Sequence, residues 1–114
     1  MRRGVALIVG SLVLAAPAAA HDLPYSWSVA KVMRVTDGAR VHVGKRVVRI
    51  DHETTLCAGR GRSTRRGGVR RWRHFDCTYT TFTPRGVGRD LEFRVHVLGA
   101  RRFLITDAHW IAGL

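Results

Sequence analysis

Apolar and polar residues alternate along much of the second half of the chain. A period of two is that of a β-strand with one buried face. We therefore expect strands at residues 71–82, 91–97 and 102–110, separated by turns that contain glycine. Connections this short cannot join parallel strands, so these segments are predicted to form an antiparallel meander. The side chains expected on its inner face are Phe75, Cys77, Tyr79, Leu91, Phe93, Val95, Val97, Phe103 and Ile105.

Residues 26–37 have the pattern of an amphipathic helix. Ser26 and Ser28 are suitable N-caps, and Gly38 stands where a residue with positive φ often ends a helix. The same residues also alternate as a strand would, with residues 37–38 as a hairpin turn. We favour the helix because the segment contains several strong helix formers.

Two extended segments are expected next, at residues 39–43 and 46–57, with a turn at residues 44–45. The connection at residues 58–70 is expected to be a mobile loop, because it contains four glycines. Together these features predict an α+β fold, in which an N-terminal helix packs on an antiparallel meander of four to five strands.

Residues 1–20 have the features of an export signal. Arg2 and Arg3 precede an apolar run, and residues 18–20 form an A-x-A cleavage site. The apolar run is too short for a stable membrane span, so no transmembrane anchor is expected after processing. We therefore expect a single mature domain at residues 21–114, located in the periplasm or outside the cell.

Cys57 and Cys77 are the two cysteines of the chain. An even pair in an exported chain predicts one disulfide. Closing a loop of this length contributes about 3 kcal/mol to stability through chain entropy.

The chain has a net charge of +12, and +10 once Arg2 and Arg3 are removed. Between residues 59 and 73 there is no acidic residue, and the positive charges are all arginines. Arginine suits phosphate, sulfate and carboxylate groups, and Trp72 offers a surface for stacking. We expect a binding or envelope-associated protein whose partner is an anionic polymer, a lipid head group or an acidic protein. The expected anion-binding residues are Arg60, Arg62, Arg65, Arg66, Arg70, Arg71, Arg73 and Trp72.

Histidines raise a different interpretation. If His21 becomes the N-terminus, its imidazole and amine would chelate copper, with Asp107 and His109 completing the site. These residues are similar to the N-terminal His and Asp-x-His ligands of small periplasmic copper carriers, and the resemblance implies a copper carrier as one alternative. As the main interpretation we expect no metal and no cofactor.

The chain also resembles small basic microbial ribonucleases in residues 79–83, although Thr78 stands where that family has a histidine. The resemblance implies an N-terminal helix on an antiparallel sheet and cleavage with Glu as base, His as acid and Arg as phosphate ligand. Residues that could fill these roles are Glu53 or Glu92, His96 or His109, and Arg94. No catalytic group emerges from spacing alone, so our main expectation is a protein without enzymatic activity.

As a whole, residues 25–110 resemble uncharacterised small exported bacterial proteins. The shared motifs are a Cys-x-Gly-x-Gly run at residues 57–61 and an aromatic-x-Cys pair at Phe75 and Cys77. The resemblance implies a disulfide-stapled fold and an exported location, and it implies no activity.

Overall fold

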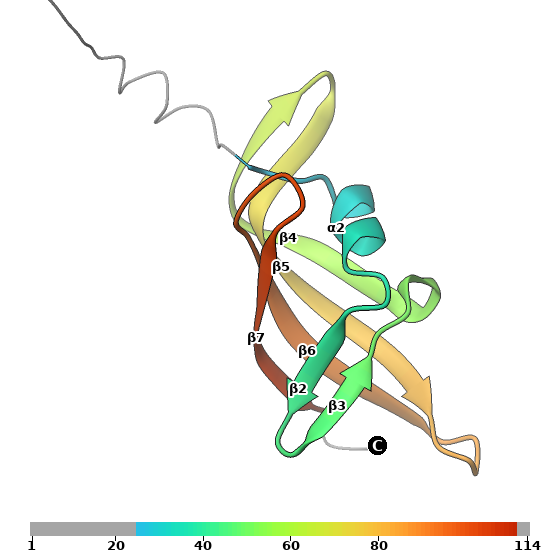
Figure 1. The fold of residues 1–114 in the computed structure, drawn as a ribbon. Helices are drawn as coiled ribbons and strands as arrows, with labels where there is room; N and C mark the ends of the chain where they lie inside the picture. The colour runs from blue at the N-terminus through green and yellow to red at the C-terminus, as the bar shows by residue number, and fades with distance from the viewer. Residues whose placement is uncertain (1–24, 112–114) are drawn as a thin grey trace, which may run out of the picture.

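The structure, a computed structural model, describes residues 25–111. The predicted export signal therefore lies outside the described residues. This part of the chain contains a short helix and six strands, which are arranged as in Figure 1. The elements are α2 (Val29–Val35), β2 (Arg40–Val43), β3 (Arg46–Arg49), the 3₁₀ turn η2 (His52–Thr54), β4 (Thr55–Arg66), β5 (Val69–Phe82), β6 (Gly88–Val97) and β7 (Phe103–Trp110).

The fold is mainly β, so the predicted α+β class with a single meander is wrong. The described strands form two antiparallel sheets, a β2–β3 hairpin and a four-stranded sheet in the order β4-β5-β6-β7. The break between the sheets comes at Asp51, whose carboxylate accepts a hydrogen bond from the backbone N–H of Glu53 and caps η2. This turn interrupts the segment that we expected to run as one strand from residue 46 to residue 57.

The helix exists but is only seven residues long. Ser28 is its N-cap and accepts from the backbone N–H of Lys31, and Gly38 follows its end with a φ of 79°. Trp27, which we had included in the helix, instead pairs with Trp72 through two backbone hydrogen bonds of 2.8 Å. The pairing uses the edge of β5 beyond the end of β6, and it leaves too few residues for a long helix.

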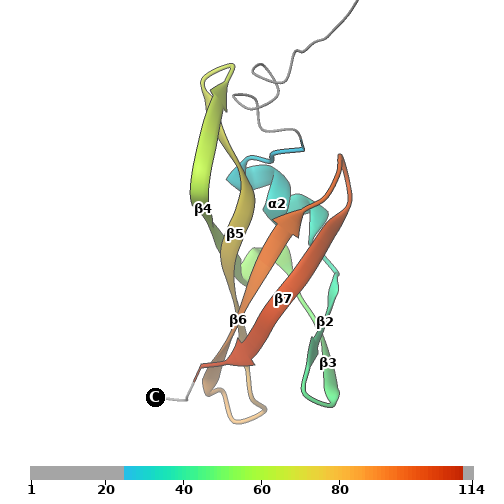
Figure 2. The same cartoon turned by 90° about the vertical axis from the view of Figure 1, so that its left-hand side faces the viewer.

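The core lies between the inner face of the four-stranded sheet and a layer made by α2 and the β2–β3 hairpin (Figure 2). The sheet contributes the alternating residues of β5 and β6 that the pattern predicted. Trp27 and Val32 cover them from the N-terminal side, and Val41 and Ile50 from the hairpin. The buried sheet residues are Phe75, Cys77, Leu91, Phe93, Val95 and Val97.

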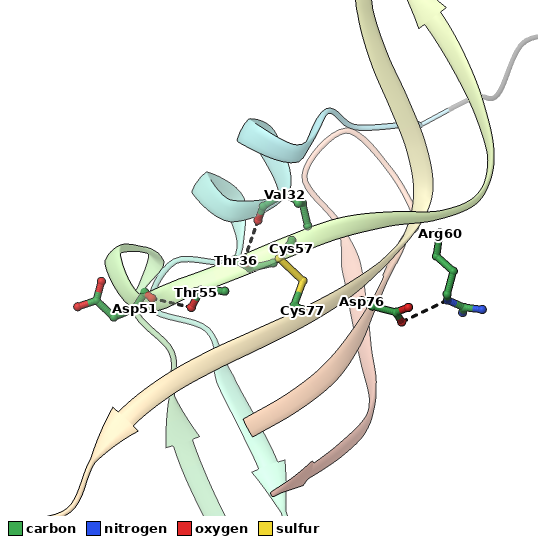
Figure 3. The surroundings of a disulfide bond; sticks show 8 residues. All are labelled: Val32, Thr36, Asp51, Thr55, Cys57, Arg60, Asp76 and Cys77. Carbon is green, nitrogen blue, oxygen red and sulfur yellow. Dashed lines mark hydrogen bonds and ion pairs between the residues drawn. A yellow bond between two sulfur atoms is a disulfide. The ribbon is translucent and has the colours of Figure 1, made fainter. Parts of the chain in front are cut away.

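The predicted disulfide is present between Cys57 and Cys77, which are directly opposite each other on β4 and β5 (Figure 3). Two threonines fix the surroundings. The hydroxyl of Thr36 donates to the carbonyl of Val32, and the hydroxyl of Thr55 donates to the carbonyl of Asp51, both at 2.6 Å. Among residues 25–111, no helix is long and apolar enough to cross a membrane.

The long connection expected at residues 58–70 is instead a two-stranded β-ribbon, with one shift of register between Arg60 and Ser63. β4 and β5 stay paired as far as Arg66 and Val69, and the turn is made by Gly67 and Gly68 with φ of 60° and 79°. Positive φ at two successive residues suits a two-residue hairpin turn. Because β6 pairs with β5 only as far as His74, the ribbon projects beyond the sheet, as Figure 1 shows. We call residues 60–73 the arginine ribbon.

Candidate functional site

The outer face of the four-stranded sheet is polar over three neighbouring strands, and no described helix or strand covers it. The register of the strands arranges its side chains in rows across the sheet. One row is Arg60, His74, His96 and Leu104, the next is Ala58, Asp76, Arg94 and Thr106, and a third is Leu56, Thr78, Glu92 and His109. We call these rows the polar face.

Alternating charges link the middle of the polar face. The carboxylate of Asp76 lies 3.3 Å from Nε of Arg60 and 3.3 Å from Nε of Arg94. Nη1 of Arg94 also lies 3.8 Å from Asp107 Oδ2. Figure 3 shows the pair of Arg60 and Asp76. All four groups are substantially exposed, so these ion pairs orient side chains more than they stabilise the fold.

A β-bulge in β7 affects the directions of the side chains of Asp107 and His109. Residues 107 and 108 of β7 stand opposite the single residue Phe93 of β6, and Asp107 has a φ of 57°. A non-glycine residue in this region of φ is strained, and such strain is concentrated at functional sites. Bulges likewise re-aim side chains next to active sites.

His109 is held between two acceptors at this bulge. Its Nδ1 lies 2.9 Å from the backbone oxygen of Asp107, and its Nε2 lies 2.9 Å from Oε1 of Glu92. Neither acceptor carries a proton, so both contacts are hydrogen bonds only when the ring is protonated at both nitrogens. The Asp107 carbonyl and the Glu92 carboxylate accordingly raise the pKa of His109. The pair is therefore an imidazole whose protonated form is stabilised by a neighbouring carboxylate.

The other two histidines of the polar face contact each other. His74 and His96 stand directly opposite on β5 and β6, with their Nδ1 atoms 2.9 Å apart. Partial burial is the largest cause that lowers the pKa of His74, and Coulombic interactions with the neighbouring imidazole of His96 and with Arg60 and Arg73 lower it further. The polar face therefore contains one histidine with a lowered pKa, His74, and one with a raised pKa, His109.

A groove of about 620 Å³ runs over the bulge. It is open to solvent, and its polar lining comes from three strands of the sheet. These lining residues include Asp76, Thr78, Glu92, Arg94, Asp107 and His109.

The arginine ribbon forms a second candidate surface. Arg65, Arg66 and Arg70 are exposed beside the glycine turn, whereas Arg71 is half-buried nearer the sheet. Nη1 of Arg65 donates to the carbonyl of Gly68 at 3.3 Å, and Nη1 of Arg70 donates to the hydroxyl of Ser63 at 2.7 Å. Both acceptors are neutral, so these two hydrogen bonds do not offset the positive charges of Arg65 and Arg70.

Trp72 contributes to the packing at the base of the ribbon. Its indole covers Gly59, where a Cβ would lie 2.0 Å from Cδ2, and it makes an edge contact with Phe75. The ring is half-buried against the core. We therefore assign Trp72 to the support of the ribbon, whereas the sequence had offered it as a stacking surface.

Of the residues expected to bind copper, the structure describes Asp107 and His109, where Nδ1 of His109 lies 2.9 Å from the backbone oxygen of Asp107. His21 lies outside the described residues. Within residues 25–111, the group of three ligand side chains with atoms close enough for one ion is Asp37, Asp51 and His52, all exposed. His52 donates to Asp37 through its backbone N–H at 3.0 Å, and its Nδ1 lies 3.1 Å from the same oxygen. These contacts lower the pKa of Asp37 and raise that of His52, and they tie η2 to the end of the helix.

The residues offered for ribonuclease chemistry separate into two groups. Glu92, Arg94 and His109 share the polar face, and Glu92 contacts His109. Glu53 lies on the exposed turn η2, and His96 belongs to the polar face but contacts His74. Sequence reasoning missed the bulge at Asp107 and the pairing of His74 with His96. The available signal for that pairing was the alternating pattern, which places His74 and His96 on the polar sides of two strands that follow each other along the chain.

Comparisons with models of protein families, with curated proteins and with solved structures find no match to the chain. No family therefore supports the resemblance to small exported proteins, and the disulfide is the part of it that the structure contains.

Proposed function

We propose that the protein binds an anionic polymer through the arginine ribbon. The observation that carries the proposal is a projecting two-stranded ribbon with seven arginines and no acidic residue between positions 60 and 73. Positive charges that repeat along a rigid element suit a partner whose negative charges also repeat. Arginine adds bidentate hydrogen bonds to phosphate or sulfate groups.

Rigidity supports the same function. The disulfide, the Trp27–Trp72 pairing and the packing of Trp72 on Gly59 all fix the base of the ribbon. A fixed ribbon loses less conformational entropy on binding than a mobile loop does. The disulfide also fits an oxidising compartment outside the cytoplasm, where anionic polymers and head groups of the cell surface would be available.

The test compares two variants that remove the same charge from different places. One replaces Arg65, Arg66 and Arg70 at the ribbon tip with glutamine. The other replaces Arg85, Arg101 and Arg102, which are exposed on other turns. Both are measured by the salt concentration that elutes them from a heparin column. We expect the tip variant to elute at much lower salt than the wild type, and the control variant to elute close to it.

Equal losses in the two variants would show that net charge alone causes retention and that the ribbon has no particular role. Vesicles with anionic head groups and an acidic protein column, tested with the same pair, identify the alternative partners. If the two variants differ more in binding to the vesicles or to the acidic protein than in binding to heparin, the partner is a lipid head group or an acidic protein and not a polymer.

A second candidate function is cleavage of RNA at the polar face. The observation that favours it is the contact between Glu92 and His109 beside Arg94, which groups a carboxylate, an imidazole and a guanidinium on one groove. Such groups supply a base, an acid and a ligand for phosphate.

This candidate is tested by incubating the purified protein with a labelled RNA. It predicts cleavage that is lost in His109→Gln and Glu92→Gln and is retained in His42→Gln, a change at an exposed histidine of β2. An absence of cleavage at several pH values would remove this candidate and leave the binding function untouched.

A further inference from the structure

We propose that the cavity between α2 and the turn from β6 to β7 binds a small organic phosphate or sulfate ester. The cavity has a volume of about 580 Å³, which is within the range of ligand pockets. The two elements that form it lie next to each other in Figure 2. Its charged lining residues are Lys31 and Arg34 of α2 and Arg101 of the turn, and no described acidic side chain lines it. We call it the basic pocket.

The three positive charges of the basic pocket are available to an external anion. Among residues 25–111, no carboxylate lies within ion-pair distance of any of the three cationic groups. The polar face differs in this respect, because Asp76 there lies 3.3 Å from both Arg60 and Arg94. An anion that enters the basic pocket therefore has no internal carboxylate to displace.

The backbone and one side chain of the basic pocket are fixed before a ligand arrives. Lys31 and Arg34 are three residues apart on α2, so their side chains leave the helix on the same side. Nζ of Lys31 lies 5.6 Å from the ring centroid of Trp27, a residue that is buried in the core. Two backbone hydrogen bonds of 2.8 and 3.2 Å to the carbonyl of Arg102 close the turn that carries Arg101. This order lowers the entropy that binding would cost.

Apolar side chains complete the lining of the basic pocket. They belong to Val35, Ala100 and Phe103. Phe103 is half-buried, and its ring makes an edge contact with Trp27 at a centroid distance of 6.1 Å. An inorganic ion would use only the charges, whereas an organic ester would also cover this apolar wall. The lining therefore favours an anion that carries an organic group.

The number and type of the cationic groups favour a phosphate or sulfate ester over a carboxylate. A monoester of either acid presents three terminal oxygens, and a carboxylate presents two. Guanidinium groups bind such oxygens through pairs of parallel hydrogen bonds, and an ammonium group acts as a point charge. Two guanidinium groups and one ammonium group can therefore serve all three oxygens of a monoester. The basic pocket shares no residue with the arginine ribbon, so this proposal does not depend on the proposed function.

The test is a titration of the purified protein with phenyl phosphate at low salt, followed by the NMR shifts of its backbone amides. Lys31→Gln, Arg34→Gln and Arg101→Gln should each weaken binding by about three- to fivefold, the size expected for an exposed charge pair. The triple variant should show no measurable binding. The matched control is Lys45→Gln/Arg46→Gln/Arg85→Gln, which removes the same charges from the exposed tips of two other hairpins and should bind like the wild type.

Three further probes identify the chemistry that is recognised. Phenyl sulfate should also bind, and the tighter of the two esters identifies the source of the anion. Inorganic phosphate should bind more weakly than phenyl phosphate by about threefold or more, because it leaves the apolar wall uncovered. Benzoate has the same ring and a carboxylate, so it should bind more weakly than either ester.

Several results would overturn the proposal. It is wrong if neither ester binds, if the control variant loses as much binding as the triple variant, or if benzoate or inorganic phosphate binds as tightly as the esters. The variant with Arg65, Arg66 and Arg70 replaced should bind phenyl phosphate normally, and a loss there that the triple variant does not share would place the anion on the ribbon. Circular dichroism checks that every variant is folded.

Discussion

Gly59→Ala should destabilise the protein strongly, although glycine to alanine is the smallest change possible. The new Cβ would lie 2.0, 2.1 and 2.5 Å from Cδ2, Cε2 and Cγ of Trp72. The indole would have to move by more than about 1 Å to restore an ordinary contact. The backbone of Trp72 cannot follow, because two hydrogen bonds of 2.8 Å hold it to Trp27. The ring must therefore leave its position over β4 and lose contact with Phe75.

The size of the effect follows from the area that this movement exposes. Losing about 100 Å² of buried apolar surface at about 25 cal/mol per Å² costs about 2.5 kcal/mol. Together with residual strain we expect a loss of about 2–4 kcal/mol in the free energy of unfolding. In a domain of this size, that loss lowers the midpoint of thermal unfolding by about 10–20 °C.

Denaturation in urea measures the loss, and Gly88→Ala is the matched control. A Cβ at Gly88 would make an ordinary contact of 3.6 Å with Phe82, so its effect should stay within about 0.5 kcal/mol. In a Trp72→Ala background, Gly59→Ala should cost less than about 1 kcal/mol, because the overlapping ring is gone. Equal effects of the two glycine substitutions in the wild type would refute the reasoning.

Three further predictions concern the covalent frame, the helix and the polar face. Cys57→Ser/Cys77→Ser should lose about 3 kcal/mol by the loop-entropy estimate, measured in urea, and reduction should raise the intact mass by two daltons. Ser28→Ala should cost about 1 kcal/mol in the same assay, because it removes the N-cap of α2. By NMR, His109 should titrate above its ordinary pKa, and Glu92→Gln should lower that pKa. Since the folded pKa is raised, this stabilisation is present below about pH 6.5. It is lost as the pH rises through the folded pKa, and a His109 that titrates at or below the ordinary value contradicts the assignment.

Much of the core could be predicted because a period of two is a local signal. Phe75, Phe93 and Val95 were expected to point inward, and all three are buried. The helix was also indicated locally, by Ser28 and Gly38, but its length was not. Trp27 is not part of the helix because it pairs with Trp72, a residue 45 positions away. A short window of sequence cannot show that this distant pairing competes with helix formation.

The arginine ribbon was misjudged for a different reason. Glycines were interpreted as a sign of mobility, whereas each has a specific task in a regular structure. Gly67 and Gly68 make the turn, Gly61 adopts a φ of 81° where the register of β4 shifts, and Gly59 makes room for an indole. The candidate site was harder still. The sequence offered His109 and Glu92 as candidate site residues, but their contact depends on a bulge that no pattern of residues predicts.

The pairing of Trp27 with Trp72 determines at which end of the chain a label or fusion partner can be joined without covering the arginine ribbon. It brings the first described residues to the base of the arginine ribbon. Ile111, in contrast, donates its N–H to the carbonyl of Asp90, which pairs with Thr80 near the end of β5 that lies away from the ribbon. A fluorophore, bead or fusion partner joined at the N-terminal side would be held next to the arginines and would compete with a ligand for access. The same addition at the C-terminal side would leave the ribbon facing outward, so binding measurements should be anchored there.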